Sequence, residues 1–233
     1  MTILALETSA KAASCAVIRD GAPVASAFQA TGLTHSRTLM PMVEAMLQNS
    51  EMALQDMDAV AVAAGPGSFT GLRIGVAAVK GLAWAADKPC VAVSTLEAMA
   101  APLAFFPGTL ICAMDARRQQ VYNAVFRSGG GLTRLSPDRA ISLEDLAAEL
   151  DAGTAYTVVG DGAKLCADAL AARGFTCALA PSHLLLQSAV GVGLVGERMA
   201  REGRTCTAQE LTPAYLRLSQ AERERLARLG AQG

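Results

Sequence analysis

The order of strand-like and helix-like segments is the feature that most constrains the fold of this chain. Three apolar segments near the start predict strands over residues 3–8, 14–19 and 23–29. Asp20-Gly21 separates the last two, and this dipeptide between apolar runs is a strong hairpin signal. Helices are then predicted over 36–49, 71–86 and 95–103, and strands over 59–64 and 90–94. Strands that alternate with helices predict right-handed crossovers and a partly parallel sheet.

The same order begins again after a boundary that we place at residues 101–108. Further strands are predicted over 109–114, 121–127 and 156–159, and further helices over 143–150, 163–173 and 185–201. Glu7, which ends the first strand, precedes Val17 by ten residues, and Asp115 precedes Val125 by the same interval. This spacing indicates an internal duplication.

A duplicated βββαβαβα unit is similar to the actin-like ATPase (ribonuclease-H-like) superfold, in which two lobes face each other across a cleft. We therefore predict an α/β protein with a first lobe over residues 1–104 and a reduced second lobe over 105–205. A polar tail follows over 206–233. The sequence leaves open whether the helix at 185–201 packs back on the first lobe.

Composition excludes several classes of protein. Hydrophobic residues make up 52% of the chain and charged residues 18%, which excludes disorder. A net charge of −1 makes the chain a poor nucleic-acid binder by itself, because that affinity comes mainly from neutralised phosphates. The six cysteines form no Cys-x-x-Cys pair, so buried free thiols are expected. No signal peptide or membrane span is evident, and we expect a soluble cytoplasmic protein.

Two acids stand where this superfold places its cleft. Glu7 and Asp115 each end the first strand of a repeat. In a working kinase such acids hold Mg²⁺ or orient water, and otherwise they cap the strand ends. The turns that follow, at 9–13 and 116–120, contain no glycine, so their amides close less easily on a phosphate. We interpret the two acids as remnants of a lost activity.

A glycine-rich loop at 65–71 joins a predicted strand to a predicted helix. It is no P-loop, because no Gly-Lys-Ser/Thr follows. One interpretation is a tight turn whose Ser68 or Thr70 caps the helix. The other is an anion or nucleotide contact at the helix N-terminus. The candidate residues for such a contact are Gly65, Gly67, Ser68, Thr70 and Arg73.

The helices at 36–49 and 71–86 carry more apolar and small residues than one buried face needs. The first is apolar almost all round, and the second has a stripe of small residues at three- and four-residue steps. A helix of this kind must be covered on more than one side, either by the late helix of the same chain or by a second chain. We expect a second chain. The candidate interface residues are Leu39, Met42, Val43, Met46, Gly71, Ile74, Gly75, Ala78 and Leu82.

No metal site is expected. His35 and His183 are the only histidines, and Leu39 occupies the position where a His-x-x-x-His helix would carry its second ligand. Arg37 lies between them and would repel a divalent cation.

Several segments closely resemble the TsaB (YeaZ) family. They are residues 5–9 (ALETS), 65–82 (GPGSFTGLRIGVAAVKGL), 114–118 (MDARR) with Tyr122, and 213–217 (PAYLR). The resemblance spans almost the whole chain, and the segment 65–82 is the most specific part. Residues after Arg217 match no motif of the family, and the tail is either a helix on a partner or a solvated segment.

The resemblance implies a function in tRNA modification. Family members help to form the threonylcarbamoyl group on the adenosine beside the anticodon of tRNAs that read codons beginning with A. They bind and activate the paralogue TsaD, which performs the transfer, and the ATPase TsaE joins the pair. They are non-catalytic by themselves, form homodimers through the same first-lobe helices, and meet tRNA only through the complex.

The same resemblance bears on cofactors and on competing activities. No cofactor is expected, and ATP or ADP would touch the chain only at the joint interface with TsaD. The alternatives are a small-molecule kinase or ATPase and a metallopeptidase of the same superfold. Loss of turnover in Glu7→Gln or Asp115→Asn would favour an enzyme, whereas dependence of a TsaD-type transferase on this chain would favour a partner subunit.

Overall fold

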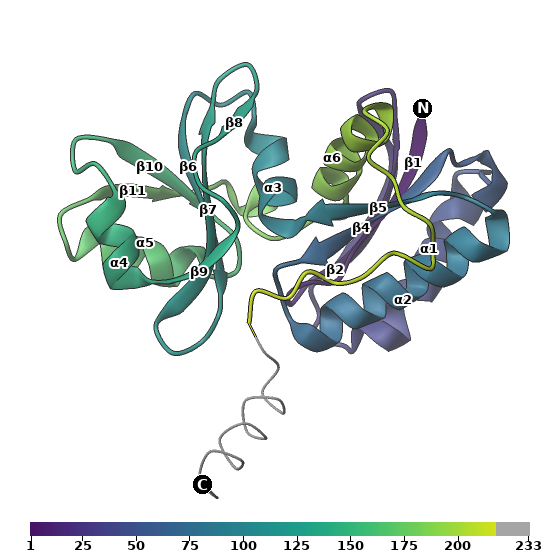
Figure 1. The fold of residues 1–233 in the computed structure, drawn as a ribbon, viewed down its shortest axis with the longest axis horizontal. Coiled ribbons are helices and arrows are strands. Elements are labelled where there is room, and N and C mark those ends of the chain that lie inside the picture. The colour runs from purple at the N-terminus through teal and green to yellow at the C-terminus, as the bar shows by residue number, and fades with distance from the viewer. Residues whose placement is uncertain (218–233) are drawn as a thin grey trace, which may run out of the picture.

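The computed structural model describes residues 1–217, in which the chain forms two α/β lobes (Figure 1). The first half contains β1 (Thr2–Glu7), β2 (Ala13–Arg19), β3 (Ala22–Gln29), α1 (His35–Asn49), β4 (Ala59–Gly65), α2 (Phe69–Ala86), β5 (Cys90–Ser94) and α3 (Thr95–Ala100). The second half contains β6 (Gly108–Asp115), β7 (Gln120–Ser128), β8 (Leu132–Arg134), β9 (Arg139–Ser142), α4 (Leu143–Glu149), β10 (Ala155–Val159), α5 (Ala163–Ala171), β11 (Thr176–Leu179) and α6 (Ala189–Arg201). The tail predictions for 218–233 lie outside the described residues.

The five strands of the first sheet and five of the six strands of the second follow the same order, and the sixth, β9, pairs with β7. In the first, the strand order is β3-β2-β1-β4-β5, with β1 antiparallel to β2 and parallel to β4. In the second, the order is β8-β7-β6-β10-β11, with β6 antiparallel to β7 and parallel to β10. The duplicated βββαβαβα prediction is confirmed, and Glu7 and Asp115 each end the central strand of their sheet.

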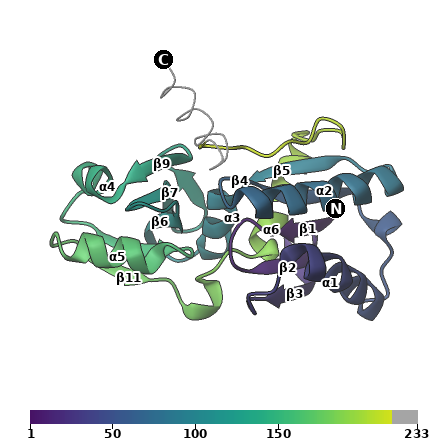
Figure 2. The same ribbon diagram turned by 90° about the horizontal axis from the view of Figure 1, so that it is seen from below.

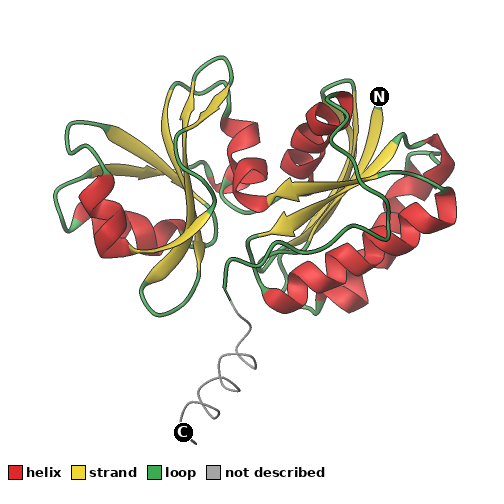
Figure 3. Cartoon of the chain, viewed as in Figure 1, coloured by secondary structure: helices red, strands yellow, loops and turns green. Residues whose placement is uncertain are grey.

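Helices cover both faces of the first sheet, which is why its central strands are apolar on both sides. Leu4 and Leu6 of β1 pack on the face covered by α1 and α2. Ile3 and Ala5 alternate with them and pack against α6 on the opposite face. In Figure 3 the red helices lie on either side of the yellow sheet.

The last helix of each half packs across the boundary between the lobes. Leu96 and Met99 of α3 are buried against the second sheet, with Leu110 and Phe126. α6, from the end of the second half, covers the first sheet at β1, β2 and β4. The question that the sequence left open for the late helix is thereby answered, because α6 packs on the first lobe.

Glycines in α6 permit this close packing. A Cβ at Gly191 would lie 2.0 Å from Ala98 O, and one at Gly193 would lie 2.2 Å from Ile18 Cγ1. Glu197 is buried at the same contact, where its Oε2 accepts a hydrogen bond from Gly21 N at 2.7 Å.

Most predicted boundaries are correct to within a few residues. The late helix begins at Ala189 rather than 185, because the Ser188 hydroxyl accepts a hydrogen bond from Val190 N and acts as N-cap. The short strands β8, β9 and β11 were not predicted. No helix within residues 1–217 is long and apolar enough to cross a bilayer.

Candidate functional site

A cavity of about 630 Å³ lies between the two lobes. It is lined by residues 9–11 after β1, 67–70 at the start of α2, 114–117 at and beyond the end of β6, Tyr122, Asp161 and residues 214–217 near the end of the described chain. The carboxyl ends of the central strands of both sheets therefore open into one space, as the sequence predicted for this fold.

Glu7 does not line this cavity. Its side chain is fully buried, Ser9 N donates to Oε1, and Oε2 has no hydrogen-bond partner among residues 1–217. The pKa of Glu7 is raised to about 7, mainly by burial and to a lesser extent by the charge of Asp161, against the lowering effect of the Ser9 hydrogen bonds. The expectation that Glu7 faces the cleft is wrong, because the turn that begins at Ser9 covers it.

Asp161, rather than Glu7, is the second acid that lines the cavity. It lines the cavity with Asp115, and burial raises its pKa. Gln187 Nε2 donates to Asp161 Oδ1 at 2.7 Å. Sequence reasoning missed Asp161 because its only signal was Gly160-Asp161-Gly162, a short turn after a predicted strand.

In each of the two turns that follow the central strands, one amide is hydrogen-bonded to the acid that ends the strand. Arg117 N donates to Asp115 Oδ1 at 2.7 Å, as Ser9 N does to Glu7. Arg117, Arg118 and Gln119 have φ values of +65°, +56° and +57°, so three side-chain-bearing residues in succession adopt the left-handed conformation. This strain is local to the cavity rim.

The glycine-rich loop is a capped turn in this structure. Ser68 Oγ accepts from Gly71 N at 3.3 Å, and Ser68 N donates to Ser9 O at 2.7 Å. Gly67 and Thr70 line the cavity. Gly65 does not line it, because it packs so closely against Ala214 that a Cβ at Gly65 would lie 2.2 Å from Ala214 O. Arg73 is engaged elsewhere, so the loop forms a wall of the cavity without the predicted arginine.

The C-terminal segment 206–217, which we call the strap, holds that arginine and closes one side of the cavity. It runs along α2 toward the gap between the lobes (Figure 1). Tyr215 stacks on Phe69 with ring centroids 4.5 Å apart, and Arg73 Nε donates to Tyr215 Oη at 3.0 Å. Arg217 then crosses to the second lobe, where its Nη1 donates to Ala116 O at 2.6 Å.

Five of the nine predicted interface residues are buried within the chain itself. Leu39, Val43 and Met46 of α1 pack in the core against β1, β2 and β4. A Cβ at Gly71 would lie 2.1 Å from Thr8 O, and one at Gly75 would lie 2.5 Å from Thr8 Oγ1. These five placements on an intermolecular surface are wrong, because the small stripe brings α2 close to its own sheet.

Part of the outer surface of the two helices is nevertheless apolar, although α1 also exposes polar side chains. Met42, Ile74, Ala78 and Leu82 are half-buried at its inner edge. Met40 of α1 is 41% exposed. On α2 this surface includes the small exposed residues Ala77, Gly81 and Ala85, whereas the exposed Arg73 and Trp84 of the same helix are not counted in it. We call this surface, formed by these eight residues, the helix face.

The histidine at the start of α1 serves the fold. His35 Nε2 lies 2.7 Å from Ala10 O, to which it donates, and Leu39 one turn later is in the core. Within the described part of the chain, no three His, Cys, Asp or Glu residues are grouped so that they could hold a metal ion.

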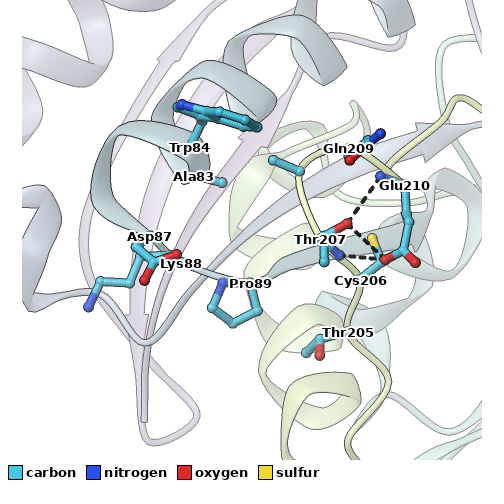
Figure 4. A pocket seen from close by; sticks show the side chains of 11 residues that line it. Ala83, Trp84, Asp87, Lys88, Pro89, Thr205, Cys206, Thr207, Gln209 and Glu210 are labelled. Atoms are coloured by element: carbon cyan, nitrogen blue, oxygen red, sulfur yellow. Dashed lines mark hydrogen bonds between the residues drawn. The ribbon is translucent and has the colours of Figure 1, made fainter.

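A second cavity, of about 820 Å³, lies where α2 ends and the strap begins (Figure 4). Trp84, the only tryptophan of the chain, forms one wall and is 78% exposed. On the other wall, Glu210 Oε2 accepts from Thr207 N and Oγ1, each at 2.9 Å. No sequence motif predicts this cavity, because residues far apart in the chain form it.

Comparison with known proteins agrees with the geometry. The family model described as TsaD, tRNA N6-adenosine threonylcarbamoyltransferase, matches residues 29–224. The protein named "tRNA threonylcarbamoyladenosine biosynthesis protein TsaB" from Bacillus subtilis is 35% identical, over 95% of this chain and 96% of that one. The Escherichia coli protein of the same name is 32% identical, over 93% and 95%.

A solved structure shows the same relationship. A Pseudomonas aeruginosa protein described as similar to peptidase YeaZ superposes with a TM-score of 0.80 at 30% identity, over 93% of this chain and 99% of that one. The duplicated sheets, the two lobes and the cavity between them define a protein of the actin-like ATPase fold class. Within that class, the chain belongs to the TsaB (YeaZ) family.

Proposed function

We propose that this chain is a non-catalytic subunit that binds and activates a TsaD-type transferase during formation of threonylcarbamoyladenosine in tRNA. Its relatives are named for the biosynthesis of this nucleoside. In this proposal the transferase supplies the chemistry and this chain supplies a docking surface. A TsaE-type ATPase joins the pair, and tRNA meets the chain only through the complex.

The helix face is the observation that carries the proposal. Its outward positions on α2 are small, and Met40 of α1 is also exposed. Small residues allow a partner helix to approach closely, and exposed methionine adapts to the shape of another chain. In the absence of the transferase, the same face would join two copies of the chain.

The cavity supports a subunit without its own phosphoryl transfer. The amides of Ser9, Ser68 and Arg117 are already hydrogen-bonded within the chain, and the strap lines one wall. Any ATP or ADP would then lie at the joint interface rather than inside this chain.

Substitutions on the helix face test the proposal without disturbing the core. A Cβ at Gly81 meets nothing within 4 Å, so Gly81→Arg adds bulk and charge only to the surface. Met40→Asp acts likewise at an exposed position. Leu39→Asp and Gly75→Trp would be uninformative, because both side chains would enter the core.

The experiment is reconstitution of tRNA modification with purified transferase, with the wild-type chain, Gly81→Arg or Met40→Asp. We expect both variants to lose binding to the transferase and to lose modification in parallel. Leu135→Asp is the matched control, because Leu135 is an apolar residue of the second lobe that is 51% exposed. Normal binding by both helix-face variants would contradict the proposal, as would modification at the full rate without this chain.

A further inference from the structure

The outer edge of the first sheet is open. β3 is the last strand in the order β3-β2-β1-β4-β5 (Figure 2). It pairs with β2 on one side, and no strand within residues 1–217 pairs with its other side. No loop of the described chain forms a backbone hydrogen bond to Val24–Phe28. A row of backbone amides and carbonyls along β3 is therefore available to another strand.

The sequence of β3 does little to protect this edge. Natural edge strands are usually blunted by charged side chains, proline or a bulge. β3 reads APVASAFQ and contains no charge. Pro23 and the register shift opposite Val17/Ile18 protect only its beginning. The stretch from Val24 to Gln29 is left open, neutral and largely apolar.

The side chains of this stretch have two different environments. Ala25 and Ala27 pack on the core beside α1. Val24 and Phe28 do not enter that core and are 45% and 52% exposed. Ser26 lies midway between these two exposed residues in the sequence.

We propose that two copies of this chain pair through β3, antiparallel and centred on Ser26. In that register, Val24 of one copy faces Phe28 of the other, and Phe28 faces Val24. An aromatic residue opposite a β-branched residue is one of the favourable cross-strand pairs. Ala25 faces Ala27 in the same way, so the strand is complementary to itself. The product is a continuous sheet with five strands from each copy.

This contact is separate from the helix face. It uses the backbone edge of β3 and the side chains of Val24 and Phe28, whereas the helix face uses exposed residues of α1 and α2. Two copies joined through β3 would each keep the helix face available for the transferase. The inference therefore does not depend on the proposed function, and either can fail alone.

A charge exchange across the proposed pair is the first test. The dimer dissociation constant is measured by sedimentation velocity in the Gly81→Arg background, which removes association through the helix face. We expect Val24→Glu and Phe28→Lys each to weaken the dimer at least about tenfold, because a charge then faces an apolar side chain. The double variant should regain most of the affinity, because each carboxylate faces an ammonium of the other copy.

The second test places a thiol at the symmetry centre. Facing residues of antiparallel strands have Cα atoms about 4.5–5.5 Å apart, which lies in the range of a disulfide. Ser26→Cys should therefore form a covalent dimer under mild oxidation with oxidised glutathione. Ala22→Cys, on the same strand but away from the centre, and the wild-type chain with its six free cysteines, are the controls.

Three outcomes would overturn the inference. The first is a Gly81→Arg chain that stays monomeric at about 100 µM. The second is a dimer whose affinity is unchanged by both single charges. The third is equal cross-linking of Ser26→Cys and Ala22→Cys, which would indicate random collision or a strand from another protein on this edge.

Discussion

Tyr215 stacks on Phe69 with ring centroids 4.5 Å apart and an interplanar angle of 25°. The contact joins the strap to the first turn of α2, and Arg73 lies 3.9 Å above the other ring of the pair, that of Phe69. Ala214 N donates to Ala64 O at 2.7 Å beside it. The end of the described chain is thereby fixed to the loop that forms a wall of the cavity.

Removal of this ring should release the strap. We expect Tyr215→Ala to weaken the local structure by about 1 kcal/mol, the usual value of an aromatic pair. Hydrogen exchange at the Ala214 amide should then accelerate by roughly five- to tenfold while the central strands remain protected. Tyr215→Phe keeps the stack and loses only the hydrogen bond to Arg73, so it should exchange nearly as slowly as the wild type. Unchanged exchange in Tyr215→Ala would contradict this role.

Glu7 should make stability depend on pH. Its pKa of about 7 in the folded chain lies above its ordinary value of 4.5, so the folded chain binds more protons between these values. The resulting stabilisation is fully present below pH 4.5 and is lost as the pH rises through about 7. The loss is at most about 3 kcal/mol.

Glu7→Gln should remove most of this dependence, because an amide carries no proton to lose. Urea unfolding between pH 4.5 and about 8.5 measures it. The variant should be more stable than the wild type at the alkaline end. Glu44→Gln on the exposed surface of α1 is the control and should keep the wild-type profile. Parallel pH profiles for Glu7→Gln and the wild type would refute the argument.

Two helical glycines should respond to alanine in opposite directions. Gly191→Ala places a Cβ 2.0 Å from Ala98 O, and we expect a loss of more than about 2 kcal/mol in the free energy of unfolding. Gly81→Ala has open space around it and should gain about 0.5–1 kcal/mol from helix propensity. Thermal unfolding of the two variants checks the pair. A destabilised Gly81→Ala would mean that this surface of α2 is covered.

The left-handed turn after β6 should be relieved by glycine. Gln119 has a φ of +57°, which costs a residue with a Cβ about 1–2 kcal/mol. Glycine avoids that strain but loses more entropy on folding, so Gln119→Gly should raise the melting temperature by about 2 °C. Gln119→Ala keeps the Cβ and should show no gain. A lower melting temperature for the glycine variant would contradict the strained turn.

Local patterns predicted the fold because the fold depends on local signals. Apolar runs, the Asp20-Gly21 turn and the spacing of Glu7 and Asp115 were sufficient for two equivalent sheets. Periodicity could not say which surface each stripe of α2 meets. Gly71 and Gly75 read as an exposed stripe, and only the position of Thr8 shows that the stripe faces inward.

The site was less predictable because long-range packing forms it. Ser9 covers Glu7, and Asp161 reaches the cavity from the second lobe, although neither relation has a sequence spacing. Arg117 and its neighbours adopt the left-handed conformation without the glycine or asparagine that usually signals it. Arg73 was correctly seen at the start of α2, but its partner Tyr215 lies 142 residues away.

The exchange of end helices between the lobes has a mechanical consequence. We expect that neither half is stable by itself, because each would present one bare apolar sheet face that only the missing helix covers. Wide opening of the lobes would likewise separate α3 or α6 from the sheet that it covers. Melting should therefore occur as a single event for both lobes.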